Sequence, residues 1–465
     1  MPDRAGERYA AAVRKAVPAL VLLGLFLALG AHGQPAAEVH AAGSHGGPVV
    51  PVLLGLVVIL LAAKIGGEVF ERLGQPAVLG ELVFGIGLGN LGLLGFGGLE
   101  FLGTSAGIEI LAQLGVILLL FQVGLESNVG EMLAVGWSSL LVAVLGVIAP
   151  FFLGWGVSAW LLPHEETLAH VFIGATLSAT SVGITARVLS DLGKLGARES
   201  KIVLGAAVID DVLGLVILSV VSGVIGAANS GGTLRGMDAG IIVVKAVVFL
   251  VGAILIGGWL SRRVFRLAGF LRIQGMLLAL ALAICFLLAY LADRIGLATI
   301  VGAFAAGLIL DGVQFRDLGE QTKHSIEELI HPIAGFLVPV FFVLMGVRVD
   351  LASFAQGPVL GFAALLTLAA ILGKMVCAAG VVERGIDRLS VAVGMVPRGE
   401  VGLIFAGIGA QLLLHGRPVI SPALFAAVVV MVIVTTLVTP PALKITLARG
   451  DRRKARRTKA ARNLS

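Results

Sequence analysis

The chain has 465 residues, of which 58% are apolar and 13% are charged. A soluble globular protein carries roughly 25% charged residues and 45–50% apolar ones, so the composition excludes an ordinary soluble protein. The mean hydropathy of +1.03 and apolar runs of about 20 residues predict an all-α polytopic membrane protein. The net charge of +6 would suggest nucleic acid in a soluble protein, but here the cations gather in loops and in the tail, so no nucleic-acid partner is expected.

Residues 1–33 have the pattern of a signal peptide. Several cations precede a short apolar run at 16–31, which ends in the small-residue motif Ala31-His32-Gly33. Because the run is short for a membrane span, a cleaved signal peptide and an uncleaved extra helix both remain open. Residues 34–48 are predicted to form a periplasmic linker. The irregular spacing of three histidines in and beside this linker does not indicate a metal site: His32, His40 and His45.

Thirteen apolar spans follow, and each is predicted to cross the membrane as a helix. The loops on the side of the tail, residues 448–465, carry 22 Lys and Arg with the tail included, whereas the opposite loops carry four. By the positive-inside rule, this bias predicts a cytoplasmic tail and a periplasmic start of the first span. The spans are 49–70, 76–95, 105–124, 132–162, 167–189, 201–226, 239–261, 274–292, 296–312, 332–347, 357–382, 389–413 and 421–447.

Several familiar motifs are absent or uninformative. No G-x-x-x-x-G-K-[ST] sequence is present, so this chain has no motif for an ATP-driven motor. Gly87-x-Gly89-x-x-Gly92 matches a dinucleotide-binding pattern, but it ends an apolar span with no preceding strand, which favours close helix packing. Cys285 and Cys377 lie in apolar runs and are predicted to be buried, inert thiols. Secondary transport, channel activity and intramembrane chemistry remain as function classes.

Two adjacent carboxylates occupy the middle of the sixth span. Asp210 lies about 12 Å along a helix from Ile202, which places it near the bilayer midplane. Neighbouring side chains point about 100° apart, so one can face a transport pathway while the other faces a neighbouring helix. Burial and mutual repulsion favour a reversibly bound proton on Asp210 or Asp211, and carboxylate oxygens also suit monovalent cations. The alternative is a purely structural hydrogen-bonding role for both.

A counter-charge for this pair is present in the eleventh span. Lys374 lies about nine residues from either end of its span, too deep to reach the interface, and Gly373 beside it leaves room for close approach. An ion pair between Lys374 and an aspartate is therefore expected. Lys245, by contrast, lies only one or two turns inside its span and is expected to extend toward the membrane surface.

Two spans are predicted to be broken helices. One contains the small and hydroxylated segment Ala179–Gly183, and the other contains Pro397-Arg398-Gly399-Glu400. Irregular backbone at membrane depth occurs where it lines a cavity or is buried in protein. The two breaks lie seven spans apart, as an inverted repeat of spans 4–6 and 11–13 requires. The alternative for the second segment is a cytoplasmic loop.

Taken together, six motifs resemble the bacterial sodium/proton exchangers of the cation–proton antiporter superfamily, closest to its second, monovalent cation:proton family. The resemblance covers residues 50 to 445 and implies thirteen helices, an inverted repeat, two crossing broken helices and a homodimer. It implies a membrane domain at 49–447, with core helices at about 105–226 and 332–447 and dimerisation helices partly within 49–95 and 239–312. The motifs are Gln75–Glu81, Phe121–Glu126, Thr180–Val182, Val208–Asp211, Gly373-Lys374 and Met395–Val401.

The resemblance also implies roles for individual residues. Asp211 would be the principal site for Na⁺ and H⁺, and Asp210 would form an exchangeable salt bridge with Lys374. Thr180 and Ser181 would supply oxygen ligands or helix-end dipoles at the crossing. Arg398 and Glu400 would neutralise the charge at the second broken segment, and Glu400 could also help to position Lys374.

The expected activity is exchange of Na⁺ or Li⁺ for H⁺ by an elevator-like movement in the bacterial inner membrane, without a cofactor and without enzymatic catalysis. The Asp-Asp pair resembles electrogenic members. A K⁺/H⁺ antiporter is the first alternative, although the short tail differs from glutathione-gated potassium antiporters with their large cytoplasmic domain. A sodium-coupled organic-anion symporter is less consistent with the charged centre. An intramembrane aspartyl protease would need its aspartates on facing helices. Cation selectivity, stoichiometry and a role in sodium tolerance or pH homeostasis stay open.

Overall fold

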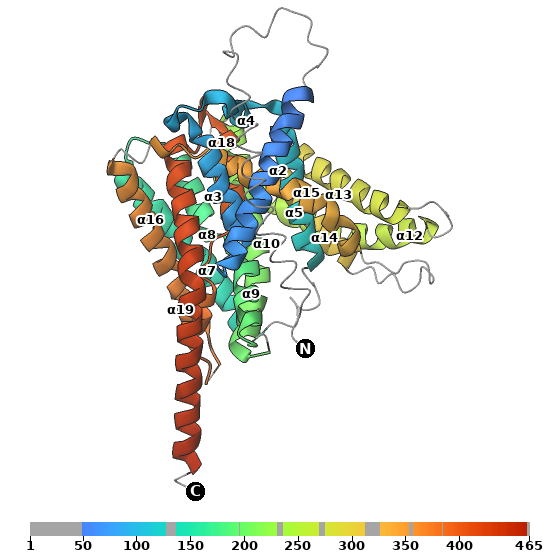
Figure 1. The fold of residues 1–465 in the computed structure, drawn as a ribbon. Helices are drawn as coiled ribbons and strands as arrows, with labels where there is room; N and C mark the ends of the chain where they lie inside the picture. Colours follow the sequence, from blue (N-terminus) through green and yellow to red (C-terminus); the bar gives the residue numbers. More distant parts are fainter. Residues whose placement is uncertain are drawn as a thin grey trace, which may run out of the picture. The chain divides into compact units, whose positions relative to one another are not determined.

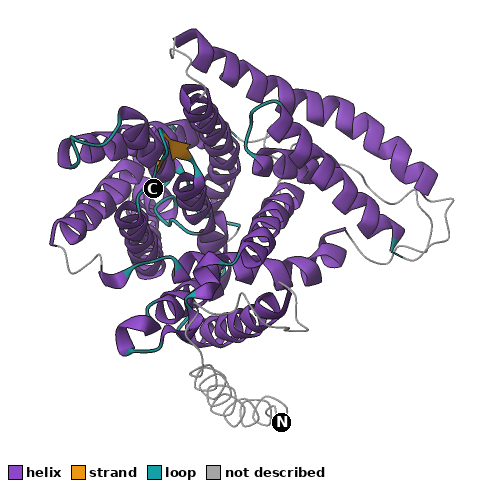
Figure 2. Ribbon diagram, turned by 90° about the horizontal axis from the view of Figure 1, so that it is seen from above, coloured by secondary structure: helices purple, strands orange, loops and turns teal. Residues whose placement is uncertain are grey.

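The computed structural model describes residues 49–126, 136–194, 196–229, 236–268, 275–311, 326–352, 357–383 and 385–462. The signal-peptide-like run at 16–31 and the linker at 34–48, with His32, His40 and His45, lie outside these residues. Within them the protein is almost entirely α-helical, as the composition predicts (Figure 1). The described strands form one small hairpin of two antiparallel strands (Figure 2).

Helices occupy all thirteen predicted spans. Nine helical segments are long and apolar enough to cross a membrane, and four shorter apolar helices accompany them among the described residues. How many of these helices cross the membrane remains a prediction. The long elements are α2 (Val49–Arg72), α5 (Ala106–Glu126), α7 (Trp137–Leu161), α10 (Arg198–Asn229), α11 (Gly236–Gly252), α13 (Met276–Arg294), α15 (Ile326–Val347), α16 (Gly357–Met375) and α19 (Pro422–Arg462).

The shorter elements complete the chain and include both halves of each broken span. They are α3 (Ala77–Gly89), η1 (Leu91–Leu94), η2 (Gly97–Leu99), α4 (Phe101–Thr104), α8 (Thr167–Ser178), α9 (Val182–Asp191), the π-helical turn η3 (Ala253–Gly257), α12 (Gly258–Ala268), α14 (Thr299–Asp311), η6 (Val376–Gly380), α17 (Arg388–Gly394), α18 (Glu400–Gln411), β1 (Leu413–Leu414) and β2 (Arg417–Pro418). Helix α19 continues without interruption into the basic tail (Figure 1).

The chain divides into two compact units. The described part of the first consists of 49–115 and 335–351, and α2 packs against α3 there through facing glycines. A Cβ atom at Gly80 would lie 2.0 Å from the carbonyl oxygen of Gly66, so only glycine permits this approach. Of the glycines in the dinucleotide-like pattern, Gly89 serves close packing, because a Cβ there would lie 2.1 Å from the Val347 carbonyl oxygen. The space beside Gly87 is open.

The second unit comprises 116–334 and 352–462 of the described chain and contains every residue of the predicted site. Helix α7 packs on α8, α10 and α16. A tight contact joins α7 to α16, because a Cβ at Gly373 would lie 2.7 Å from the Cα of Pro150. The two predicted repeats share one order of elements: α7, the broken α8/α9 and α10 in the first, and α16, the broken α17/α18 and α19 in the second.

Candidate functional site

Two short stretches of non-helical backbone meet inside the second unit. Residues 179–181 separate α8 from α9, and residues 395–399 separate α17 from α18. The Ser181 amide donates a hydrogen bond of 3.0 Å to the carbonyl oxygen of Pro397, so the two breaks touch through their backbones. Both breaks fall in the predicted segments. Because Arg398 is fully buried, the alternative of a solvated cytoplasmic loop does not apply.

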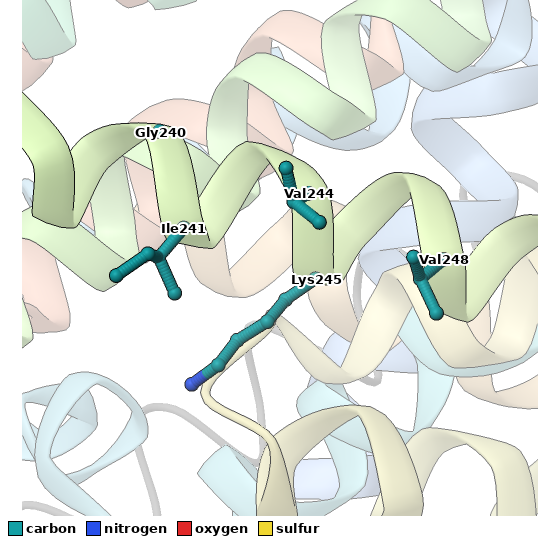
Figure 3. Close-up of a pocket in the computed structure, with 5 residues that line it drawn as sticks. All are labelled: Gly240, Ile241, Val244, Lys245 and Val248. Carbon is teal, nitrogen blue, oxygen red and sulfur yellow. The ribbon is translucent and has the colours of Figure 1, made fainter.

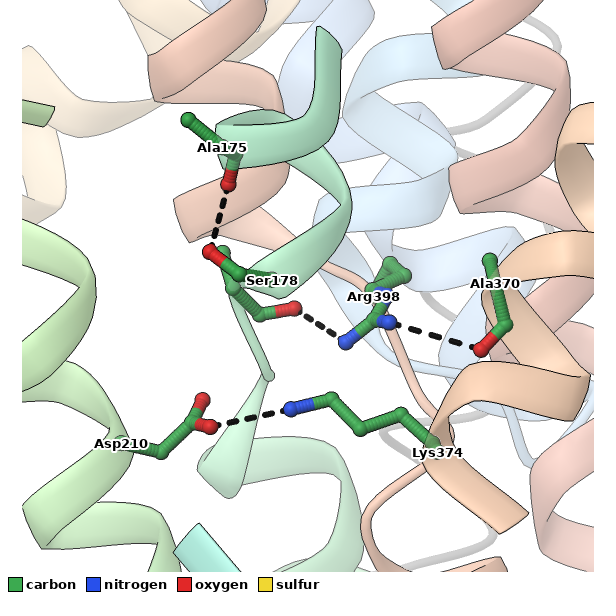
Figure 4. Close-up of polar contacts among 7 residues, drawn as sticks. Ala175, Ser178, Asp210, Ala370, Lys374 and Arg398 are labelled. Carbon is green, nitrogen blue, oxygen red and sulfur yellow. Dashed lines mark hydrogen bonds and ion pairs between the residues drawn. The ribbon is translucent and has the colours of Figure 1, made fainter. Parts of the chain in front are cut away.

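Arg398 holds the second stretch in place and neutralises carbonyl groups. Its Nη1 atom donates to the carbonyl oxygen of Ala179, the residue that follows the last turn of α8, and its Nη2 atom lies 3.5 Å from the carbonyl oxygen of Ala370 on α16 (Figure 4). A cation at the carbonyl end of a helix is favourable because that end carries partial negative charge. Arg398 thus satisfies the carbonyl oxygen of Ala179, an acceptor that the break after α8 leaves open.

Glu400 supplies the complementary charge at the amide ends. It is the first residue of α18, and its carboxylate accepts a hydrogen bond of 2.8 Å from the hydroxyl of Ser181, the residue before α9. An anion at a helix N-terminus is stabilised by the partial positive charge there. The expectation that Glu400 also positions Lys374 has no contact to support it among the described residues, where Ser181 is its hydrogen-bond partner.

Asp210 and Lys374 form an ion pair, as the sequence predicts for Lys374 and one of the two aspartates. The Nζ atom of Lys374 on α16 lies 2.9 Å from Oδ1 of Asp210 on α10, and both side chains are fully buried (Figure 4). Helix α7 lies close behind this pair, because a Cβ at Gly146 would lie 3.3 Å from Lys374 Nζ and 2.9 Å from Cys377 Sγ. Cys377 is a free, buried thiol, as is Cys285.

Asp211 is buried beside this pair and carries an acceptor that the protein leaves open. Its Oδ1 atom is buried without a hydrogen-bond partner in the described structure, and so is Oδ2 of Asp210. Asp211 interacts electrostatically with Asp210, Glu400 and Lys374. The Thr180 hydroxyl oxygen is also buried and unpartnered. Because buried polar atoms are normally hydrogen-bonded, each of these open oxygens is a candidate to bind a proton or a dehydrated cation.

This arrangement differs from a resident metal centre. No group of three or more His, Cys, Asp or Glu side chains that could hold a metal ion occurs in the described ranges. The available oxygens come instead from two carboxylates, a hydroxyl and the backbone of the crossing. Oxygen ligands of this kind can bind a hard monovalent cation.

Sequence reasoning missed the groups that support the crossing. The Thr436 hydroxyl donates to the Arg398 carbonyl oxygen, and the Arg398 amide lies 3.4 Å from the Thr435 hydroxyl oxygen. The Thr185 hydroxyl donates to the carbonyl oxygen of Gly394 at the end of α17, over 2.6 Å. The adjacent hydroxyls of Thr435 and Thr436 in a mainly apolar span are a visible signal, whereas the sequence does not mark which backbone carbonyls need a partner.

Comparisons with known proteins identify the family. The family model described as sodium/hydrogen exchanger, transmembrane, matches residues 17–449. The high-affinity Na(+)/H(+) antiporter NhaS3 of Synechocystis is 40% identical over 427 residues, covering 84% of this chain and 89% of the relative. The Na(+)/H(+)-K(+) antiporter GerN of Bacillus cereus is 38% identical over 405 residues, covering 85% and 96%.

A solved structure supports the fold. The sodium proton antiporter MjNhaP1 of Methanocaldococcus jannaschii superposes with a TM-score of 0.62 at 16% identity, covering 87% of this chain and 97% of that one. With the family model matching almost the whole chain and relatives of 40% and 38% identity, this multi-pass membrane protein belongs to the sodium/hydrogen exchanger family.

Proposed function

We propose that this protein is a secondary transporter that exchanges Na⁺ or Li⁺ for H⁺ and that Asp211 carries both ions in turn. The observation that supports this most directly is the open, buried Oδ1 atom of Asp211 beside the Asp210–Lys374 ion pair. A transporter of this kind makes no covalent change in its substrates, and we assign the protein no enzymatic activity. The names of its relatives favour the same activity.

Exchange follows from competition for one carboxylate. When Asp211 binds a proton, the site is neutral there and can move without a bare charge in the membrane interior. At higher pH the carboxylate loses its proton and can accept a cation, and Lys374 can release Asp210 to help coordinate it. The empty and doubly ionised site should cross poorly, which couples inward and outward movement of the two ions.

Thr180 and Ser181 are proposed to complete the cation site. The Thr180 hydroxyl is buried without a partner, so it can turn toward a bound ion at no cost in existing hydrogen bonds. The Ser181 hydroxyl is occupied by Glu400, and therefore it is better placed to fix the crossing than to bind the ion directly. Arg398 and Glu400 keep the crossing neutral while the ions on Asp211 change.

The larger movement and the membrane setting are part of the proposal. We place the tail in the cytoplasm and the protein in a bacterial inner membrane, since the lysines and arginines of its loops lie mainly on the side of the tail. We infer a homodimer whose core helices, within about 105–226 and 332–447, move as an elevator against dimerisation helices partly within 49–95 and 239–312.

A second candidate is K⁺/H⁺ exchange, which the printed name of the Bacillus cereus relative favours. Carboxylate and hydroxyl oxygens bind Na⁺, Li⁺ and K⁺ alike, and the choice depends on the size of the site and the number of ligands. The same Asp211 chemistry would serve either cation.

The test is dequenching of a ΔpH-sensitive dye in energised everted vesicles after addition of NaCl, LiCl or KCl between pH 6.5 and 9. Dequenching by Na⁺ or Li⁺ that disappears in Asp211→Asn supports the proposal. A response to K⁺ alone transfers the protein to the second candidate. No response to any of the three cations would reject both and make sodium-coupled symport the next activity to test.

A further inference from the structure

Glu81 on α3 is a buried carboxyl group that ion exchange at Asp211 does not use. It belongs to the first unit, which holds none of the residues of the candidate site. Its side chain is 7% exposed, and its Oε2 atom is buried without a hydrogen-bond partner in the described structure. A buried carboxylate that is ionised and unpaired costs several kcal/mol, so this group needs either a proton or a cation.

Glu81 lies on the face of α3 that packs against α15. Glu81 and Gly85 are four residues apart and therefore share one face of the helix. A Cβ at Gly85 would lie 2.3 Å from the Val343 carbonyl oxygen, and one turn further along both helices the approach is equally close. The same parallel register places Glu81 beside Pro339, one turn earlier on α15. Residues 335–347 of α15 contain no titratable side chain, so this helix offers Glu81 no counter-charge.

Pro339 leaves a backbone acceptor of α15 without its helical donor. Proline has no N–H group, so the carbonyl oxygen of Gly335, four residues earlier, receives no hydrogen bond from position 339. Lys64 on α2 takes this place, since its Nζ atom lies 3.5 Å from the Gly335 carbonyl oxygen. Lys245 differs, because its ammonium extends away from α11 beside aliphatic side chains (Figure 3). The ammonium of Lys64 therefore has a defined acceptor inside the first unit.

Two acceptors compete for the ammonium of Lys64. Glu81 interacts with it electrostatically, but the two side chains form no ion pair in the described structure, where Lys64 lies at the Gly335 carbonyl oxygen instead. The remaining charged residues near this end of α2 are exposed: Glu68, Glu71 and Arg72. Among the described residues, Lys64 is thus the cation available to an ionised Glu81.

We propose that Glu81 is a second proton-binding site, separate from Asp211, and that its proton decides which acceptor Lys64 contacts. With a proton on the carboxyl group, Glu81 is neutral and Lys64 stays at the Gly335 carbonyl oxygen, as in the structure. Loss of the proton leaves a buried carboxylate, and Lys64 turns from α15 to α3 to pair with it. Proton release therefore replaces a contact between α2 and α15 by one between α2 and α3.

The experiment follows the protonated carboxyl group directly. Infrared spectra of the purified full-length protein are recorded as the pH is raised, in an Asp211→Asn background that removes the carboxyl group of the exchange site. A carboxylic acid C=O band that falls with rising pH should be present in this parent and absent after Glu81→Gln. Glu68→Gln is the matched control and should leave the band unchanged, because its carboxylate is accessible to solvent and paired with Arg72.

Two further variants should move this titration in opposite directions. In Lys64→Met an ionised Glu81 has no cation, so the band should persist to a proton concentration about tenfold lower. In Pro339→Ala the new N–H group can bond to the Gly335 carbonyl oxygen and release Lys64, so the band should disappear at a proton concentration about threefold higher. The matched controls replace a second membrane lysine and a second proline of α15, and both should titrate as the parent does: Lys245→Met and Pro332→Ala.

Three results would overturn the proposal. A titrating band that survives Glu81→Gln would belong to another carboxyl group. A band that is absent at every pH, or present at every pH, would mean that Glu81 does not exchange its proton. Equal titration of Lys64→Met, Pro339→Ala and their controls would show that Lys64 does not change its acceptor. None of these readouts depends on cation transport, so the site is tested separately from the proposed function.

Discussion

Lys374 and Asp210 come from helices far apart in the sequence, yet their Nζ and Oδ1 atoms lie 2.9 Å apart with both side chains fully buried. Such a pair is costly to assemble, because both ions lose their hydration, and it is costly to break on one side. A buried pair that can open under a competing cation is therefore suited to switching. In the proposed mechanism, Asp211 next to it is the carboxylate for which the cation and a proton compete.

Replacement of Asp211 by asparagine should abolish exchange. Asparagine keeps the size of the side chain but removes the negative charge, so it can neither hold a cation nor release a proton. The measurement is cation-dependent dye dequenching in everted vesicles at equal protein amounts. Asp293→Asn, at an exposed position near the end of α13, is the matched control and should retain wild-type activity. Full exchange in Asp211→Asn would reject the assignment of the carrier carboxylate.

Lys374→Ala should destabilise the protein more than removal of both partners does. The single replacement leaves Asp210 buried without its cation, at a cost of about 3–5 kcal/mol if the carboxylate stays charged. Lys374→Ala combined with Asp210→Asn leaves no unpaired charge and should recover part of the loss. Melting temperatures in detergent test this order. If the double variant is less stable than Lys374→Ala, the unpaired charge of Asp210 is not the source of the lost stability.

Transport should respond to membrane potential. If two protons move in one direction for one cation in the other, one from Asp211 and one from Asp210 or Lys374, each cycle carries net charge. The initial rate in proteoliposomes should therefore change when valinomycin and potassium gradients set the potential to different values. In Lys374→Ala the response should weaken, since one proton site is lost. Rates that are independent of potential in the wild type would refute electrogenic exchange.

The close approach of α7 to the ion pair predicts an asymmetry between two glycines of the same helix. In Gly146→Ala the new Cβ would lie 2.9 Å from Cys377 Sγ and 3.3 Å from Lys374 Nζ, so the pair must shift. In Gly156→Ala the Cβ has no atom within 4 Å. Transport and melting temperature should fall in the first variant and stay unchanged or rise slightly in the second, because alanine favours the helix. Equal behaviour of the two variants would contradict the packing around Lys374.

Thr436→Val should weaken the crossing of the two broken helices, although Thr436 lies on α19, which contributes no charged residue to the site. The replacement removes the hydroxyl that donates to the Arg398 carbonyl oxygen and leaves a buried acceptor unpaired, at a cost of about 1–3 kcal/mol. Exchange should slow and the melting temperature should fall. Thr439→Val is the control, since the Thr439 hydroxyl bonds to the Thr435 carbonyl within α19 itself. A larger loss of exchange or stability in Thr439→Val than in Thr436→Val would contradict the role of Thr436 in supporting the crossing.

Much of the site can be predicted from residue types because charge inside a membrane is rare and costly. Asp210, Asp211 and Lys374 stand out in apolar spans for that reason, and Pro397 with Gly399 marks a helix that cannot continue. The same reasoning places the helix breaks near residues 180 and 398. It does not reveal the partner of Glu400, whose carboxylate accepts a hydrogen bond from the Ser181 hydroxyl.

The sequence by itself determined the membrane class, the helical spans, the broken segments and the identity of the ionisable residues, since each depends on local hydropathy, local breakers or the presence of a charge. The family resemblance named Asp210 as the partner of Lys374, and the structure contains that pair. Only the tertiary structure decided that Arg398 binds the carbonyl oxygens of Ala179 and Ala370, and that Thr436 supports it. These contacts join residues on separate helices, and they depend on where backbone atoms lie and on where side chains point. Their geometry arises from packing around glycines such as Gly146 and Gly373, and no local pattern of residues encodes it.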